Sequence, residues 1–268
     1  MDDLRKLTTP TTVGTDGLRE WLTKLGEVSR ALAQVFKLRI VFLLLISALG
    51  GAVLGAGGWP GGRAFWLLML SGGLSAAGAS ALNQYLERER DRQMTRTRHR
   101  PLASGGTVSP TLVLALGIGM LISSVVLAAI FNPALAIFNG LGAAIYIGVY
   151  TLWLKPRTVL NIVIGGAAGS CAVLSGGAAA GAWNQPGVLA LAALIFLWTP
   201  VHFWSLAMAY QKDYARTGFP MLPVHISGKR AAAWIALHTT GSSIIALGLA
   251  AHPKLSYLYL LTTLLASL

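Results

Sequence analysis

The stretch AFWLLMLSGGLSAAGASALNQYLERERDRQMTRTRHRPL, residues 64–102, decides the fold because it joins two opposite kinds of sequence. Residues 64–86 carry no charged side chain, and a run of about twenty such residues crosses the hydrocarbon layer as a helix. Residues 83–102 contain six arginines, two glutamates and one aspartate. The stretch therefore predicts a membrane-spanning helix that ends in a charged segment.

Apolar runs of this kind recur along most of the chain. Hydrophobic residues make up 54% of its 268 residues and charged residues only 11%, against about 25% charged residues in a typical soluble domain. The runs lack the polar face that a surface helix of a soluble protein would show. We predict an all-α, polytopic transmembrane bundle of about eight spans, or nine if the C-terminus is truncated. The expected spans are 40–58, 64–86, 110–130, 133–154, 159–182, 187–209, 231–251 and a short last one, 255–268.

Basic residues predict how the bundle is oriented. All Lys and Arg residues except Arg63 and Lys254 fall in the N-terminal segment or in the loops after the second, fourth and sixth expected spans. Because basic loops stay on the cytoplasmic side, this side is predicted to be cytoplasmic. The net charge of +12 then reflects topology and attraction to anionic lipid, and we expect no nucleic-acid partner.

The N-terminal segment predicts the domain organisation and the location. Residues 1–36 are expected to form a polar cytoplasmic tail with a helix that leads into the bundle. Residues 37–268 are expected to form the transmembrane domain, with cytoplasmic motif loops at 83–109 and 202–230. Transit peptides of organelles are poor in acids, whereas this segment has several, so we expect a multi-pass protein of a bacterial-type plasma (inner) membrane with a cytoplasmic N-terminus. The acids are Asp2, Asp3, Asp16, Glu20 and Glu27.

The remaining carboxylates are few, and they gather on the predicted cytoplasmic side. They are Glu87, Glu89, Asp91 and Asp213. On a helix that continues out of the second span, Asn83, Glu87 and Asp91 are spaced i, i+4 and i+8. Each step of four turns the side chain by about 40° and rises about 6 Å, so the three form one slanting stripe, while Glu89 faces away. Oxygen ligands of this kind suit Mg²⁺, which binds carboxylates together with substrate phosphates.

Arginines follow this stripe and are suited to phosphate oxygens, which guanidinium groups bind through paired hydrogen bonds. They are Arg92, Arg96, Arg98 and Arg100. Carboxylates next to guanidinium groups fit a metal-bridged diphosphate. The alternative is that the acids pair with neighbouring arginines on a solvated helix end. Asn83 favours the functional interpretation, because a polar amide one turn deeper is costly at a helix end that enters lipid.

The second polar loop reads HFWSLAMAYQKDYARTGFPMLPV, residues 202–224. His202 and Asp213 lie eleven residues apart, about three helical turns, so a continuous helix would place them on one face. An ionisable group within a span indicates function by default. A neutral His202 bonded to a backbone carbonyl, and Asp213 paired with Lys212 at the surface, are the structural alternatives.

Three segments in order resemble the UbiA superfamily of intramembrane prenyltransferases, and within it the protohaem IX farnesyltransferase (haem O synthase) branch. The resemblance extends from about Lys37 to Arg230. Several positions depart from the pattern. Glu87 stands where the branch has aspartate, and Ala209 stands at the first position of a second paired-aspartate motif. Leu38, Pro156 and Val201 stand where Pro, Arg and Pro are expected. The segments are NQYLERERDRQMTRTRHRPL (83–102), LKPRTVLNIVIGGAAG (154–169), and WTPVHFWSLAMAYQKDY with GFPMLPV (within 198–224).

The resemblance implies Mg²⁺-dependent transfer of a farnesyl group from farnesyl diphosphate to a vinyl group of haem b, giving haem O for terminal oxidases. The implied partners are farnesyl diphosphate, haem b, membrane lipid and a downstream haem A synthase. One alternative is a prenyltransferase of the same superfamily that acts on an aromatic or quinone precursor. The other is a transporter of an anionic, lipid-like ligand.

The resemblance also implies which residues of this sequence bind the metal and the substrates. The metal ligands, which are also the expected catalytic set, are Asn83, Glu87, Asp91 and Asp213. The expected substrate-binding residues are Arg96, Arg100, Lys155, His202, Lys212, Lys37 and Arg39.

Overall fold

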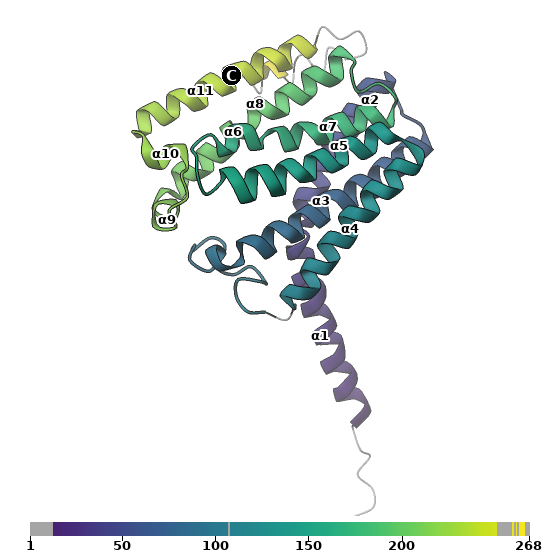
Figure 1. The fold of residues 1–268 in the computed structure, drawn as a ribbon, viewed down its shortest axis with the longest axis vertical. Coiled ribbons are helices and arrows are strands. Elements are labelled where there is room, and N and C mark those ends of the chain that lie inside the picture. The colour runs from purple at the N-terminus through teal and green to yellow at the C-terminus, as the bar shows by residue number, and fades with distance from the viewer. Residues whose placement is uncertain (1–12, 107, 251–258, 260, 262, 266–268) are drawn as a thin grey trace, which may run out of the picture.

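The computed structural model describes residues 13–106, 108–250, 259, 261 and 263–265 (Figure 1). In this part of the chain all regular structure is helical, which confirms the predicted all-α class. The helices are α1 Val13–Val35, α2 Leu38–Ala56, α3 Gly62–Asp91, α4 Pro110–Phe131, α5 Pro133–Ala144, the π-helix η1 Ile145–Leu154, α6 Asn161–Gly165, α7 Ala167–Ala179, α8 Pro186–Ala209, α9 Gln211–Arg216, α10 Leu222–His225 and α11 Gly228–Leu249.

Seven segments among the described residues are long and apolar enough to cross a membrane. They are α2, α3, α4, α5 continued by η1, α6 with α7, α8 and α11. These segments correspond to the first seven predicted spans. The eighth, 255–268, lies mostly outside the described residues.

Small residues bring the first span against the fifth. A Cβ atom added to Gly51 of α2 would collide with the backbone carbonyl of Val173, and one added to Gly176 of α7 would collide with the carbonyl of Ala48. Lipid is as apolar as the helix surfaces, so helices in a membrane associate through close packing rather than the hydrophobic effect. The two glycines therefore allow α2 and α7 to meet backbone to backbone.

A buried polar cluster fixes α3 against α4 and α5. The Ser124 hydroxyl donates to the Ser71 carbonyl at 2.6 Å, and Asn139 Nδ2 donates to Ser71 Oγ at 3.1 Å. Ser75 Oγ donates to the Asn139 carbonyl at 3.0 Å. Hydrogen bonds between helices are favourable in lipid, where polar groups have few other partners. The cluster sets the position of α3, the helix that carries the first charged motif.

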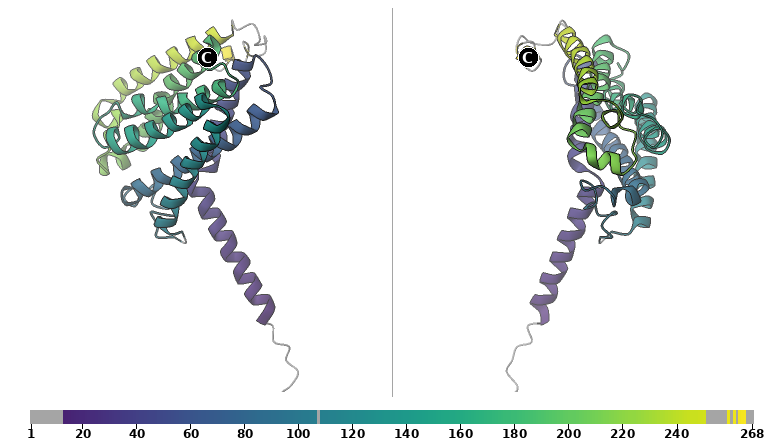
Figure 2. Two further views of the ribbon diagram at one scale, coloured as in Figure 1. Left: turned by 45° about the vertical axis from the view of Figure 1, so that its right-hand side comes forward. Right: turned by 90° about the vertical axis from the view of Figure 1, so that its left-hand side faces the viewer.

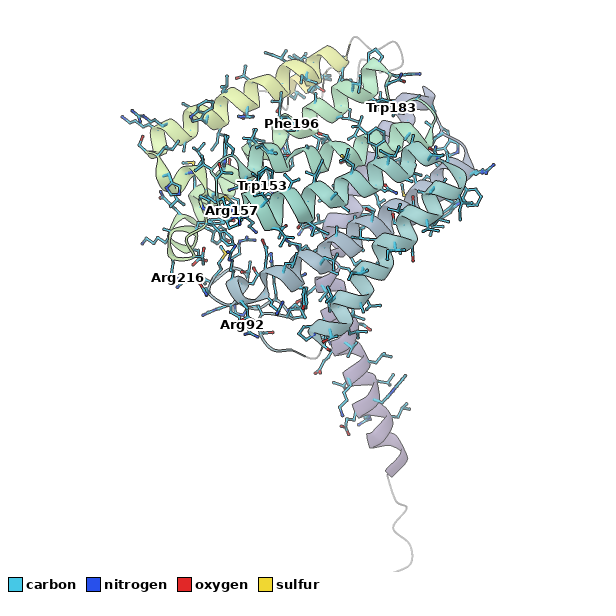
Figure 3. All side chains as sticks on the ribbon, in the orientation of Figure 1. Arg92, Trp153, Arg157, Trp183, Phe196 and Arg216 are labelled. Carbon is cyan, nitrogen blue, oxygen red and sulfur yellow. The ribbon has the colours of Figure 1, made fainter. Side chains whose placement is uncertain are left out.

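The charged loops gather at one end of the bundle. Arg92, Arg157 and Arg216, from three different connections, lie together at the left in Figure 3, whereas Trp183 lies at the opposite end. This arrangement agrees with the grouping of basic residues on which the predicted topology depends.

Helix α1 leaves the bundle and runs across the direction of the spans (Figures 1 and 2). The side-chain amide of Gln84 donates to the carbonyls of Gln34 and Val35 at 2.7 and 2.9 Å, which satisfies carbonyls that the end of a helix leaves free. Lys37 then adopts a left-handed backbone with φ 49°, and α2 begins at the next residue. A single turn thus joins α1 to the first span.

Candidate active site

The site is built on the last turns of α3. Asn83, Glu87 and Asp91 are 2%, 6% and 5% exposed, whereas Glu89 on the other side of the helix is exposed and pairs with Arg92 at 2.7 Å. The three buried side chains therefore share one face, as the four-residue spacing predicted. Buried polar groups at a helix end need partners, because an unpaired charge in an apolar environment is costly.

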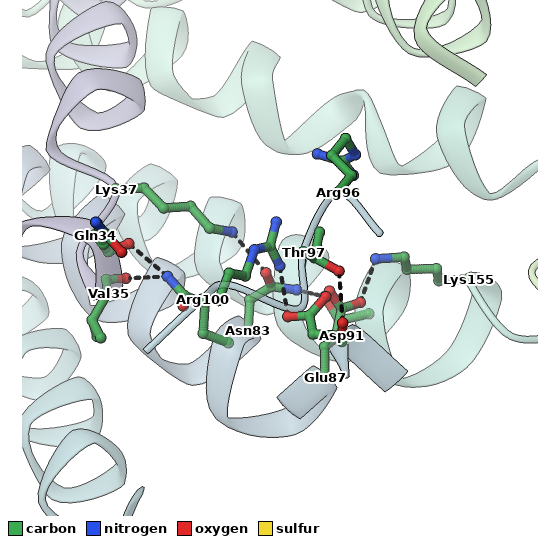
Figure 4. Close-up of polar contacts among 12 residues, drawn as sticks. Gln34, Val35, Lys37, Asn83, Glu87, Asp91, Arg96, Thr97, Arg100 and Lys155 are labelled. Carbon is green, nitrogen blue, oxygen red and sulfur yellow. Dashed lines mark hydrogen bonds and ion pairs between the residues drawn. The ribbon is translucent and has the colours of Figure 1, made fainter. Parts of the chain in front are cut away.

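Each group of this stripe is met by a cation from a different part of the chain (Figure 4). The Lys37 ammonium, at the turn before α2, donates to Asn83 Oδ1 at 2.8 Å. The Lys155 ammonium, just after η1, pairs with Glu87. The Arg100 guanidinium, in the loop after α3, pairs with Asp91 Oδ2 at 2.7 Å. Segments far apart in the sequence thus converge on the end of α3.

The π-helix η1 orients the amide of Asn83. Asn83 Nδ2 donates to Thr151 Oγ1 at 3.1 Å, and the Thr151 hydroxyl donates to the Tyr146 carbonyl at 2.8 Å. Lys37 also donates to the Tyr146 hydroxyl, at 3.3 Å. The amide oxygen of Asn83 therefore faces Lys37. Thr151 and Tyr146 were not predicted as site residues, because the sequence gives no sign that this span is wound as a π-helix.

The site carries more positive than negative charge. Two carboxylates face the three cations, and the surplus falls on Lys37: burial, and then the nearby Arg100 charge, lower the pKa of Lys37 from 10.5 to about 7. Burial alone would also lower the pKa of Lys155, but the adjacent Glu87 carboxylate and other nearby groups outweigh it and raise that pKa above its ordinary value. A ligand with several negative charges would relieve this surplus.

The donor set of the stripe fits a hard divalent cation. Among the described residues no three His, Cys, Asp or Glu side chains lie close enough to hold a metal. The stripe instead offers two carboxylates and one amide, all oxygen donors, and each already faces a positively charged group. Magnesium binds through one or two carboxylates plus waters and substrate phosphates, whereas zinc and copper prefer nitrogen and sulfur. The residues present therefore fit Mg²⁺.

Asp213 joins the two motif loops. One of its oxygens accepts from the Thr95 hydroxyl at 2.9 Å, and the other from the Arg96 backbone N–H at 3.3 Å. Arg216 pairs with the same carboxylate at 3.1 Å. The Arg96 guanidinium in turn donates to the Tyr214 hydroxyl at 3.4 Å. Asp213 thus holds Arg96 and the loop after α3 against α9, and its predicted role as a metal ligand stays a prediction.

The remaining predicted substrate-binding residues lie on the surface. Arg39, His202 and Lys212 are exposed, and no hydrogen bond in the described part of the chain joins them to the stripe. His202 stacks on Trp198 with ring centroids 4.9 Å apart. The structure thus brings Lys37, Lys155 and Arg100 to the stripe, and it holds Arg96 in the adjoining loop.

Fold and site together define an intramembrane helical bundle with a buried, cation-rich site at one end. Residues 44–268 match the UbiA prenyltransferase family, so the chain belongs to that family. It is accordingly a multi-pass membrane protein.

Curated relatives share much of the sequence. "Protoheme IX farnesyltransferase 2" of Paramagnetospirillum magneticum is 48% identical over 200 residues, which cover 73% of this chain and 68% of the relative. "Protoheme IX farnesyltransferase" of Synechococcus sp. (strain JA-3-3Ab) is 41% identical over 218 residues, covering 80% of this chain and 64% of the relative. The chain thus spans about two thirds of the length of these relatives.

Solved structures share the fold. A UbiA homolog from Archaeoglobus fulgidus bound to GPP and Mg²⁺ superposes with a TM-score of 0.71 at 20% identity, covering 88% of this chain and 86% of that one. A UbiA homolog from Aeropyrum pernix K1 without ligand also gives 0.71 at 20% identity, covering 85% of each chain. At these identities the likeness establishes the fold alone.

Proposed function

We propose that the chain transfers a farnesyl group from farnesyl diphosphate to a vinyl group of haem b and so forms haem O. The two curated relatives carry the name of this activity. The observation that carries the proposal is the buried stripe of Asn83, Glu87 and Asp91 facing Lys37, Lys155 and Arg100. Such a site suits an anionic leaving group that must be held while its bond to carbon breaks.

The cations of the site would bind the diphosphate. Arg100 offers a planar donor that can contact two phosphate oxygens, whereas Lys37 and Lys155 act as point charges. Arg96 is held at the adjoining loop by Tyr214 and by the carboxylate of Asp213. Fixed positive groups stabilise the charge that develops on the departing oxygen without having to reorganise.

Asn83, Glu87 and Asp91 would hold Mg²⁺. When bound, the ion would supply neutralisation of the charge on the diphosphate leaving group. Lys37, Lys155 and Arg100 contact the same oxygens. Phosphates bound by these cations would therefore lie next to the ion, so that every charge in the site would have a partner.

Burial would protect the reactive farnesyl carbon from water. Tyr146 and Tyr150 stack beside the stripe with ring centroids 5.9 Å apart and planes 9° apart. Aromatic faces attract cations, and a dry site strengthens that attraction. The pair is suited to stabilise an allylic cation while the acceptor vinyl group approaches.

The cellular setting is part of the same proposal. The motif loops and the N-terminus would lie on the cytoplasmic side of a bacterial-type plasma membrane, since the basic residues concentrate at that end. Haem O made there would pass to a haem A synthase or directly to a terminal oxidase.

The experiment is a product assay with the full chain in lipid nanodiscs. Farnesyl diphosphate is supplied with haem b or, in a parallel reaction, with an aromatic acid, and products are followed by mass and by released diphosphate. We expect a farnesylated haem whose formation stops when Mg²⁺ is chelated. Prenylation of the aromatic acid alone would overturn the haem acceptor, and no diphosphate release with either acceptor would overturn the transferase itself.

A further inference from the structure

Helix α1 carries an open apolar face. Leu18, Trp21, Leu22 and Leu25 follow the spacing i, i+3, i+4 and i+7, which places them on one side of the helix. They are 57%, 58%, 52% and 47% exposed. The opposite side is polar and internally paired, with the Lys24 ammonium 2.7 Å from Glu20. The rest of the described chain leaves the apolar stripe uncovered, although water is a poor solvent for it.

The position of α1 indicates what covers this stripe. Gln84 of α3 binds the last carbonyls of α1, and the first span begins one residue after Lys37. The helix therefore leaves the bundle where a span enters the lipid. From there it runs across the spans rather than along them (Figures 1 and 2), which is the direction of the bilayer surface.

We propose that α1 lies in the interfacial layer of the bilayer, at the end of the bundle that carries the charged loops, with the Leu18–Leu25 stripe buried at the boundary of headgroups and acyl chains. Amphipathic helices with a polar face and low overall hydrophobicity bind membranes in this way. Trp21 suits the position, since its ring combines an apolar body with one hydrogen-bond donor.

The charges of α1 define the kind of lipid surface that it fits. Its three basic residues, Arg19, Lys24 and Arg30, are balanced by three acidic residues, Asp16, Glu20 and Glu27. Attraction to anionic headgroups grows with net positive charge near the surface. Because the net charge of α1 is zero, apolar burial drives the association, which is thus independent of anionic lipid.

Spin labels on the two faces of α1 test this proposal. The full chain carries one cysteine, the buried Cys171, so Cys171→Ala gives a background for single labels. Leu25→Cys places a label on the stripe, and Thr23→Cys places a matched label on the polar side; both positions are exposed, so neither change threatens folding. The proteins are studied in nanodiscs of phosphatidylcholine, with and without phosphatidylglycerol, using oxygen as the apolar and a nickel chelate as the aqueous relaxing agent.

We expect the label at 25 to favour oxygen over the nickel chelate and the label at 23 to show the reverse, in both lipid mixtures. Equal access of the nickel chelate to both labels would overturn the proposal, because α1 would then stand free in water. Dipolar broadening between labels at 25 on different chains would assign the stripe to a second copy instead. Protection only with phosphatidylglycerol would overturn the apolar mechanism.

A second measurement excludes an effect of the label itself. Leu18→Ser together with Leu22→Ser removes half of the stripe, and we expect the label at 25 to become more accessible to the nickel chelate. Glu20→Ser on the polar side is the control and should leave the label at 25 unchanged. No shift in the double variant would contradict burial of the stripe in lipid.

Discussion

Asp91 is the outermost carboxylate of the stripe and one of the proposed Mg²⁺ ligands, and Arg100 is the cation that faces it. We expect Asp91→Ala to lower turnover of farnesyl diphosphate by about 10²- to 10³-fold, because the proposed site for Mg²⁺, which would stabilise the leaving diphosphate, loses one of its oxygens. Membrane insertion should remain intact. Glu89→Ala removes a carboxylate two residues away that lies on the exposed side, and it serves as the control. Near-normal activity of Asp91→Ala would rule out the metal assignment.

Glu87 departs from the pattern of the family branch that the sequence resembles, because that branch has aspartate at position 87. We expect Glu87→Asp to keep substantial activity, because the charge survives and Lys155 on a flexible stem can follow the shorter side chain. Glu87→Gln keeps the length but removes the charge, and it should be far less active. Steady-state rates at saturating Mg²⁺ compare the two variants, and an equal loss of activity in both would show that arm length matters as much as charge.

Lys37 predicts a pH dependence of diphosphate binding in the metal-free protein. With a pKa of about 7, its ammonium loses its proton as the pH rises through neutrality. Only the ammonium form attracts the diphosphate, so affinity for a non-hydrolysable farnesyl diphosphate analogue in chelator should fall above pH 7, by at most about tenfold per pH unit. Lys37→Arg stays charged and should flatten the profile, whereas Lys24→Arg on α1 should not. A flat profile in the unmodified protein would contradict the prediction.

At the scale of elements, η1 shows where sequence patterns stop being informative. The four-residue spacing of Asn83, Glu87 and Asp91 predicted their common face, because α3 is a regular helix up to Asp91. The span that ends in η1 was predicted equally well as a span. A π-helix, however, has more residues in each turn than an α-helix. Side chains such as Tyr146 and Thr151 therefore face directions that a period of 3.6 does not give.

The contact of α2 with α7 gives a prediction about stability. In Gly176→Ala the added methyl group would meet the backbone carbonyl of Ala48, which cannot turn aside as a side chain can. We expect a loss of roughly 1–3 kcal/mol in the free energy of unfolding, as for other overpacked sites. Gly119→Ala in α4 is the control, because nothing lies within 4 Å of its added methyl group. Unfolding in mild detergent measures both, and an equal effect would contradict the close contact.

At the scale of the whole molecule, the charge asymmetry between the two ends was visible in the sequence. Long uncharged runs predicted the spans because lipid excludes charge, so neither homologues nor tertiary contacts were needed. The convergence of Lys37, Lys155 and Arg100 on α3 could not be predicted in the same way. It depends on how helices pack around small residues such as Gly51 and Gly176, and one sequence does not specify which small residues face each other.

Arg63 tests the proposed orientation. It lies at the start of α3, at the end of the bundle opposite the motif loops, and its guanidinium stands 5.3 Å from the Phe131 ring centroid. We expect Arg63→Ala to change farnesyl transfer little, since the site lies at the other end of the same helix. Arg100→Ala, which removes the partner of Asp91, is the comparison and should be severely impaired. A comparable loss in Arg63→Ala would place part of the chemistry on the far side.

The backbone contact between α2 and α7 also bears on how a long isoprenoid reaches the interior. Gly51 and Gly176 each lie directly against a backbone carbonyl of the other helix. The two helices cannot separate without losing these close contacts, so this side of the bundle is rigid. We therefore expect a lateral opening for a hydrocarbon tail to form between a different pair of helices of the bundle. Accordingly, we expect substrate and product to pass between helices whose contacts are made by side chains, which can move aside and return.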